Sequence, residues 1–219
     1  MRPTVDQLHT PGKYLLVDSF GIDEMNLFLL RELGVRPKPS QPARKRGPGR
    51  WLALLVFAVV GGVVGYGVGQ LIAKNSAVDS FLLQLGVGVA ALFLLLPVHE
   101  FIHGLAFKGI GAPTIGYGYS LKSMMIYAYC QKFPTTLREV AFVAVMPFLI
   151  LTAGLLAAWV VWPTYGVSWA TLLVLHTSGC IGDFVLINYY LKNRHRTIYT
   201  YDDLEGERKT YFFEEIAVR

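Results

Sequence analysis

Residues 94–107 read LLLPVHEFIHGLAF, so three ionisable side chains, His99, Glu100 and His103, interrupt an otherwise apolar segment. On insertion scales, an Asp, Lys or Arg at the centre of a bilayer helix costs about 2.5–3.5 kcal/mol, so a segment that keeps ionisable groups is expected to use them. The spacing is H-E-x-x-H. On a helix, His99 and His103 share one face and can reach one ion, while Glu100 lies on the adjoining face. The pattern predicts a metal site.

Zn²⁺ suits these residues, because imidazole is a good ligand for it and a catalytic zinc site has three protein ligands and one position for water. The ion lowers the pKa of that water from near 16 to about 7, and Glu100 is placed to accept the proton as a general base. We therefore predict metal ligation by His99 and His103 and catalysis by Glu100. The alternative is a pair of core histidines bonded to neighbours, with Glu100 paired to a base.

Asp183 is the candidate for the third ligand, because it is the single carboxylate in the apolar run 167–191. It lies nine residues before Lys192, and His103 lies five before Lys108. At about 1.5 Å per residue, both sites are some 7–14 Å from a helix end that faces the same side. We therefore predict that Asp183 completes the zinc site. The alternative is an ion pair between Asp183 and a base such as Lys122 or Arg138.

Other polar and small residues of the same run are weaker candidates. His176 precedes Asp183 by seven residues, which is about 10 Å along the axis and too far to share the ion in an unbroken helix. We expect it to be a packing histidine or a residue that faces a pore. Asn188 is a weak candidate for substrate contact, and Gly179 and Gly182 are expected to allow a close approach of helices.

The elements that carry these residues are those of a membrane protein. Of the 219 residues, 53% are apolar and 16% are charged, against roughly 25% charged in soluble domains. Four apolar runs each have the roughly 20 residues that a transmembrane helix needs. They span about 51–73, 81–107, 140–162 and 167–191. The predicted fold class is an all-α membrane protein with four transmembrane helices and a small β-rich insert between helices 2 and 3.

The basic residues indicate the orientation. They precede the first run, lie between the second and third, and follow the fourth, whereas residues 163–166 contain none. By the positive-inside rule, both termini and the 2–3 connection are cytoplasmic, in a multi-pass protein of the cell membrane. Because the charges border helices, the net charge of +5 reports topology and does not predict nucleic-acid binding.

Three parts of the chain are distinguished by composition. We predict a cytoplasmic segment with a basic, Pro-rich linker at 1–50, a metalloprotease-like transmembrane domain at 51–192, and a cytoplasmic tail at 193–219. No signal peptide is expected, because the first apolar run begins about fifty residues in. Residues 23–33 are predicted to form an amphipathic helix that lies either on the membrane or on the protein.

Short strands are predicted where Tyr, Ile and Thr accumulate. The insert 111–136 has Pro and Gly at its borders and favours two strands at roughly 114–121 and 124–131. The tail sequences IYTYDD and TYFFEE also indicate strands. The two cysteines, Cys130 and Cys180, predict neither a disulfide framework nor a cysteine-based metal site.

The HEFIH segment late in one transmembrane helix, with Gly182-Asp183 in a later one, resembles the site-2-protease-like intramembrane metalloproteases. The chain is more similar to small bacterial membrane proteins classed as putative zincin peptidases, over about residues 95–192. The resemblance implies Zn²⁺ bound by His99, His103 and Asp183, and hydrolysis of peptide bonds in or beside the membrane. It also implies that segment 114–131 holds an extended substrate by strand pairing.

Some features depart from the site-2 pattern. The Asp-Gly order is reversed, and an asparagine–proline element and a PDZ-like domain are absent from the sequence. Two other functions therefore stay open: a zinc-containing membrane binding or scaffold protein without proteolysis, and a small metal or proton transporter. The predicted partners are a membrane-protein or peptide substrate and the lipid bilayer. A homodimer is the alternative to packing within the bundle for Gly61, Gly65 and Gly69.

Overall fold

The computed structural model describes residues 2–35, 76–120 and 125–216, with side chains in the second range described from residue 80. Its helices are α1 (Val5–Leu8), α2 (Met25–Glu32), α4 (Ser76–Gly109), α5 (Leu137–Val161), α6 (Gly166–Gly179) and α7 (Ile181–Lys192), with 3-10 turns at Ile22–Glu24 and Pro163–Tyr165. Its strands are β1 (Tyr14–Gly21), β2 (Gly116–Ser120), β3 (Met125–Tyr129), β4 (Thr135–Thr136), β5 (Ile198–Asp203) and β6 (Lys209–Glu215).

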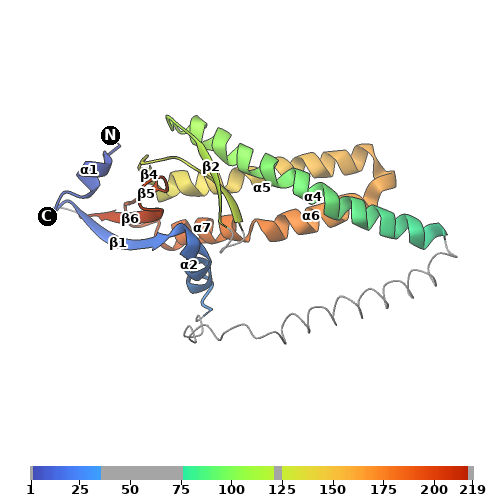
Figure 1. The fold of residues 1–219 in the computed structure, drawn as a ribbon, viewed down its shortest axis with the longest axis horizontal. Coiled ribbons are helices and arrows are strands. Elements are labelled where there is room, and N and C mark those ends of the chain that lie inside the picture. Colours follow the sequence, from blue (N-terminus) through green and yellow to red (C-terminus); the bar gives the residue numbers. More distant parts are fainter. Residues whose placement is uncertain (1, 36–75, 121–124, 217–219) are drawn as a thin grey trace.

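The long helices run side by side and form the elongated half of the molecule (Figure 1). Ser80–Gly109 and Leu137–Val161 are each long and apolar enough to cross a membrane. A third span exists if α6 and α7, which meet at a 47° bend, are counted as one. These elements coincide with the predicted runs 81–107, 140–162 and 167–191, and the run 51–73 lies outside the described residues.

Helices α4 and α6 approach closely at one glycine. A Cβ added to Gly88 would lie 2.8 Å from Cβ of Thr171 and 2.9 Å from the backbone oxygen of Ser168. The hydroxyl of Ser168 also donates a hydrogen bond to the backbone oxygen of Gln84 at 2.8 Å. Small residues and interhelical hydrogen bonds are the means by which helices associate in lipid, where the hydrophobic effect does not drive them together.

The glycines predicted to serve this purpose do not do so in the described structure. A Cβ built on Gly179 or Gly182 meets nothing within 4 Å. These two residues instead flank Cys180, where α6 ends and α7 begins. Since glycine lowers the stability of a helix interior, their position is consistent with a break in the helix at this point.

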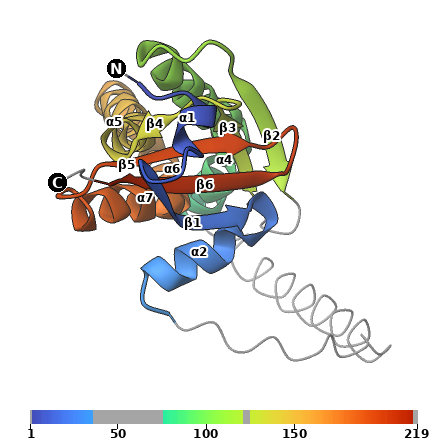
Figure 2. The same cartoon turned by 90° about the vertical axis from the view of Figure 1, so that its left-hand side faces the viewer.

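A four-stranded antiparallel sheet, in the order β1-β6-β5-β4, lies across one end of the helices (Figures 1 and 2). The tail strands were predicted, whereas β1 was not, so the description "all-α" is too narrow for this mostly helical protein. Because β1 pairs with β6, the N-terminal segment and the tail lie at the same end of the helices. Helix α2 packs on this assembly through Phe28, which is buried against Phe212 and Tyr189.

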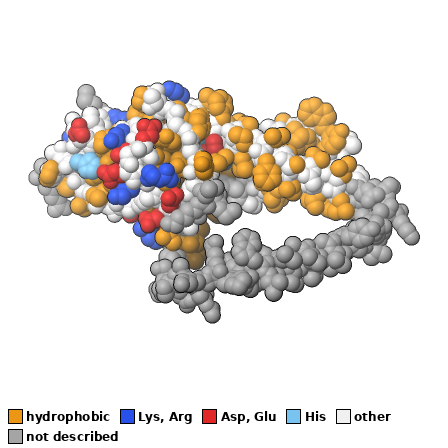
Figure 3. All heavy atoms as spheres, in the orientation of Figure 1, with side chains coloured by type: hydrophobic (Ala, Val, Ile, Leu, Met, Phe, Trp, Pro, Cys, Tyr) orange, Lys and Arg blue, Asp and Glu red, His pale blue; other side chains and the backbone are white. Residues whose placement is uncertain are grey.

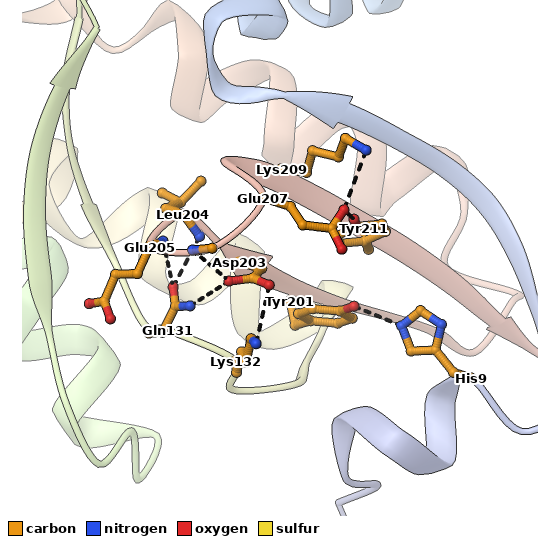
Figure 4. A network of polar contacts seen from close by, with 11 residues as sticks. His9, Gln131, Lys132, Tyr201, Asp203, Leu204, Glu205, Glu207, Lys209 and Tyr211 are labelled. Carbon is orange, nitrogen blue, oxygen red and sulfur yellow. Dashed lines mark hydrogen bonds and ion pairs between the residues drawn. The ribbon is translucent and has the colours of Figure 1, made fainter.

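The two faces of the sheet have different partners. One face carries Ile198 and Phe212 into a core with α7 residues. The other carries Tyr201 toward α1, where its hydroxyl lies 2.7 Å from Nε2 of His9 (Figure 4). The alternation along β5 and β6 follows from the two-residue period of a strand.

A second, two-stranded sheet consists of the β2–β3 hairpin, whose strands fall within the predicted segments 114–121 and 124–131. Gly118 is opposite Tyr127, and a Cβ there would lie 2.7 Å from the tyrosine ring, so the ring covers the glycine. The hairpin rests against α4, because a Cβ on Gly104 would lie 2.1 Å from the hydroxyl of Tyr117. Gly104 directly follows His103 in α4, so the hairpin contacts the helix next to the H-E-x-x-H motif.

The surface is divided in the same way as the fold. In the space-filling view, hydrophobic side chains dominate the helical half, and charged side chains gather over the sheet (Figure 3). Among the exposed large apolar residues of the helices are Leu83, Phe93, Leu94, Val160 and Val174. Exposed apolar surface of this extent on helices of spanning length is consistent with membrane association.

Candidate metal centre

Helix α4 positions both histidines of the H-E-x-x-H motif toward the interior of the bundle. His99 and His103 are four residues apart and therefore lie on the same face. Their Nε2 atoms are 3.1 Å apart, and their rings meet edge to face at 4.8 Å between centroids. The side chains of both histidines are largely buried. Two imidazole nitrogens therefore converge on one point.

Asp183 reaches the same point from α7. Its Oδ2 lies 3.2 Å from Nε2 of His99, and its Oδ1 lies 3.3 Å from Nε2 of His103. The residue is in the first turn of α7, because the helix begins anew at Ile181 after the break at Cys180. A helix N-terminus is a favourable place for a carboxylate, since the backbone N–H groups there are unpaired and carry partial positive charge. The break thus puts the predicted third ligand beside the two histidines.

The separation of these atoms fits a single zinc ion. Ligands at about 2.0–2.1 Å in a tetrahedral site are about 3.3–3.4 Å from one another. The nitrogen–nitrogen and nitrogen–oxygen distances of 3.1, 3.2 and 3.3 Å are close to that value. Two imidazoles and a carboxylate also form a donor set that zinc accepts. The residues present therefore fit the ion, although their role as its ligands stays a prediction.

The environment of His103 selects the tautomer that a metal requires. Its Nδ1 lies 3.0 Å from the backbone oxygen of Val143 on α5. Since a carbonyl can only accept, Nδ1 carries the proton and donates it, and in the neutral ring Nε2 keeps its lone pair. Metal-ligating histidines are commonly oriented by a second hydrogen bond of this kind. Val143 therefore holds the ring with Nε2 directed at Asp183 and His99.

Glu100 lies beside the three converging residues and differs from Asp183 in its contacts. Its Oε2 is buried and has no hydrogen-bond partner among the described residues. The carboxylate also accepts a hydrogen bond from the backbone of Ala128 on β3. An unpartnered buried oxygen is costly and calls for a ligand such as water. Glu100 therefore matches the general base, whereas Asp183, which faces both Nε2 atoms, matches the third ligand.

A second group of potential ligands shares His99 and was not predicted. The ligand atoms of His99, His176 and Cys180 lie within 4.8 Å of one another, and Cys180 Sγ lies 3.9 Å from both ring nitrogens of His176. The ring centroid of His176 is 5.6 Å from that of His99. The expectation that His176 lies too far away assumed an unbroken helix, and the bend at Cys180 removes that condition.

Two depressions reach the centre from different sides. One, of about 420 Å³, lies between α4, the β2–β3 hairpin and α6, and is lined by His99, Glu100 and His176 among others. The second, of about 390 Å³, extends from Glu100 and Asp183 to the sheet strands β5 and β6. We call the second one the sheet-side cavity. Both volumes are in the range of ligand pockets, and both depressions are lined by residues of the centre.

Asn188 and Cys130 lie outside the group of converging side chains. Asn188, the weak candidate for substrate contact, is exposed on α7 and lines neither depression. Cys130 lines the sheet-side cavity and is a free, buried cysteine, and its burial raises the pKa of the thiol. A protonated thiol of this kind is a poor nucleophile. Neither residue therefore takes part in the chemistry described below.

No curated protein and no solved structure matches the sequence. Residues 92–198 match the model of a family described as putative zincin peptidase. The matched region begins before the H-E-x-x-H motif and ends at the start of β5, so it contains all the converging residues, the C-terminal part of α4 and the whole of α7. A zincin family implies a metallopeptidase and zinc, and residues 92–198 of this chain are similar to the putative zincin peptidase family.

Proposed function

We propose that the protein is a membrane-embedded zinc metalloendopeptidase that hydrolyses peptide bonds with a zinc-activated water. The observation that carries the proposal is the convergence of His99, His103 and Asp183 within 3.1–3.3 Å, with Glu100 beside them. When bound by these three residues, a zinc ion would supply Lewis acidity and lower the pKa of a water molecule to about 7.

The chain itself performs the proton transfer and the positioning. Glu100 accepts the proton of the attacking water and passes it to the leaving amine. The backbone of Ala128 holds the carboxylate of Glu100 in place, and its buried Oε2 is available for the water. The backbone oxygen of Val143 keeps His103 in the required tautomer. These contacts fix the geometry before the substrate arrives, which lowers the reorganisation needed in the reaction.

Strand β3 is suited to hold an extended substrate. The strand runs beside α4, and its residue Ala128 contacts the general base. The 420 Å³ depression lies between this hairpin and α4, with Tyr119 and Ile126 on its wall. We propose that a membrane-protein or peptide substrate pairs with the hairpin there and thereby presents its scissile bond to Glu100. A strand held in this way is unwound, as cleavage of a helical membrane segment requires.

The setting of the site is proposed to be the cytoplasmic side of the cell membrane. The apolar surface of α4, α5 and α6 supports burial in lipid, and the charged sheet at one end supports a position outside it. With the run at 51–73 as a first span, the chain would cross four times and keep both termini in the cytoplasm. The common sheet of β1 and β6 supports this arrangement, because it requires both segments on one side.

The test compares Glu100→Gln with Glu205→Gln, which removes an exposed carboxylate on the β5–β6 turn. Each protein is purified in detergent, its zinc is measured, and it is incubated with a library of synthetic peptides whose fragments are identified by mass spectrometry. Glu100→Gln is expected to keep zinc and lose cleavage by at least about a hundredfold, the usual contribution of a general base. Glu205→Gln should cleave like the wild type. Equal cleavage by both variants and the wild type contradicts the proposal.

The same experiment also distinguishes the peptidase from the alternative function, a non-proteolytic binding protein. A zinc-loaded wild type that binds peptides but cleaves none would be the non-proteolytic binding protein. The unpartnered Oε2 of Glu100 favours the peptidase, because ligand geometry alone does not require a carboxylate at that position.

A further inference from the structure

The wall of the sheet-side cavity opposite the metal centre is polar over a small area. Strand β5 turns Ile198, Thr200 and Asp202 to one side of the sheet, because alternate residues of a strand share a face. Ile198 is buried in the core with Phe212. Thr200, Asp202 and Thr210 on the neighbouring strand line the cavity instead. This face of β5 therefore changes from apolar, where it packs in the core, to polar, where it lines the cavity.

Asp202 is the charged group of this wall. Thr210, its partner in the register of β5 and β6, donates a hydrogen bond from Oγ1 to Oδ1 at 2.7 Å. Among the described residues, this is the single hydrogen bond of the carboxylate, and no ion pair is formed by it. The neighbouring Asp203 is different, because it binds Gln131 and Lys132 (Figure 4). The carboxylate of Asp203 thus has a cationic partner, whereas that of Asp202 has none in the part of the chain that the structure describes.

A second, independent observation comes from Thr200. Its side chain is 6% exposed, and its Oγ1 has no hydrogen-bond partner among the described residues. Buried hydroxyls normally have a partner, because an unsatisfied one lowers the stability of the fold. Thr200 and Asp202 are neighbours on the same face of β5 and line the same cavity. The hydroxyl oxygen of Thr200 and the carboxylate of Asp202 therefore line the same cavity, and among the described residues the first has no hydrogen-bond partner and the second no ion pair. This arrangement suits a donor group that carries several hydrogens.

The rest of the cavity fits the same kind of ligand. Its described lining includes three carboxylates, of Glu100, Asp183 and Asp202, and contains no Lys or Arg. Apolar side chains such as Phe20 and Met25 line the space near the sheet. A lysine or arginine side chain combines a cationic head with an apolar stem and would meet both kinds of surface. Burial raises the pKa of Asp202 to about 6, so the carboxylate is still charged at neutral pH.

We propose that Asp202, with the hydroxyls of Thr200 and Thr210, binds a basic side chain of the substrate, so that the peptidase selects peptides with lysine or arginine close to the scissile bond. This inference rests on the proposed peptidase function and specifies its substrate class. Asp202 acts as a specificity-determining residue and takes no part in bond cleavage. The cation would donate to the free oxygen of Asp202 and to Oγ1 of Thr200, and so provide the partners that both groups lack.

The test uses pairs of dipeptide hydroxamates that differ by lysine or its uncharged analogue norleucine, at each of the two positions. The hydroxamate anchors each probe on zinc, while the side chain samples the cavity. In at least one pair, the wild type should bind the lysine probe about tenfold more tightly, as expected for one charge-assisted hydrogen bond. Asp202→Asn should bind both alike, whereas Glu205→Gln should retain the preference. Equal affinity for both probes in every wild-type pair overturns the inference and leaves the peptidase proposal intact.

A second measurement does not depend on zinc. Hexylammonium and its neutral analogue hexanol are added to metal-free protein, and the apparent melting temperature is recorded in detergent. Hexylammonium should stabilise the wild type and Glu205→Gln more than Asp202→Asn, whereas hexanol should not distinguish the three proteins. If no hydroxamate binds, the peptidase proposal fails, and the amine experiment alone decides the inference. Equal stabilisation of all three proteins by hexylammonium then overturns it.

Discussion

The Nε2 atom of His99 on α4 lies 3.2 Å from Oδ2 of Asp183 on α7, although the two residues are far apart in the sequence. His103 makes the corresponding contact with Oδ1 at 3.3 Å. A carboxylate that straddles two imidazoles is expected to hold them in place without metal and to bind the ion with them when it is present. The helix break at Cys180 is what brings α7 into this position.

The first prediction concerns metal content. Protein purified in detergent should contain about one zinc per chain, and Asp183→Ala should lose most of it, because removal of one of three ligands leaves an incomplete site. Mass spectrometry of the metal content measures both. The matched control is Asp6→Ala, which removes an exposed carboxylate of α1 and should keep the zinc. Zinc-free wild type, after dialysis against zinc, would count against the whole site.

The second prediction separates the two groups of ligands that share His99. If zinc is bound by His99, His103 and Asp183, His176→Phe keeps it, since the new ring preserves the packing of His176 against Phe148. His103→Phe should lose it. Zinc retention is measured by titration with a chromophoric chelator, in which the two variants should differ by at least about tenfold in affinity. The reverse result would assign the ion to His99, His176 and Cys180.

The third prediction concerns the contact of α4 with α6. Gly88→Ala should lower the apparent melting temperature in detergent by several degrees, equivalent to about 1–3 kcal/mol, because the added methyl meets a backbone oxygen at 2.9 Å. Gly86→Ala on the same helix meets nothing within 4 Å and should be neutral or stabilising by up to about 1 kcal/mol. A similar change in both variants would mean that the helices do not approach at Gly88.

The fourth prediction concerns pH and Asp202, whose pKa is raised by burial from 3.8 to about 6. Between these values, the folded protein binds more protons than the unfolded chain, so stability falls as pH rises through this window. The penalty is fully present above about pH 6 and amounts to at most about 3 kcal/mol. Asp202→Asn should remove this dependence.

Thermal unfolding in detergent at about pH 4 and about pH 7.5 measures the effect as the difference between variant and wild type. The difference should favour Asp202→Asn only at the higher pH. Other titrating groups occur in both proteins and cancel in the comparison. A difference that does not change with pH would show that the carboxylate is not perturbed by burial.

The sequence was informative where a local pattern determines the structure. The four-residue spacing of His99 and His103 defines one face of a helix, and the depth of Asp183 relative to Lys192 was enough to select it as their partner. The enrichment of Tyr, Ile and Thr between Pro and Gly predicted strands at roughly 114–121 and 124–131, and β2 and β3 lie within these segments. In each of these cases, the relevant information is contained in a short segment of the chain.

Other features depend on contacts between distant segments and were missed. Strand β1 is stabilised by its pairing with β6, which lies far away in the sequence. Its own sequence, YLLVDSFG, does not predict that pairing. The bend at Cys180 brought His176 to His99. Glycines on both sides of Cys180 were the sequence signal for this bend, and the prediction of an unbroken helix did not use it. Likewise, the period of β5 groups Thr200 with Asp202, but only the packed sheet shows which face the cavity.

The pairing of β1 with β6 also imposes an order on assembly. All the described long helices lie between these two strands in the sequence, so β1 is synthesised before them and its partner after them. During synthesis the helices are therefore complete before β6 is available, and until then β1 has no strand to pair with in this sheet. The wall that carries Asp202 and Thr210 is consequently the last part of the cavity to form. A nascent chain therefore contains His99 and His103 before the sheet side of the cavity exists, and the cavity is complete only after β6 has been synthesised.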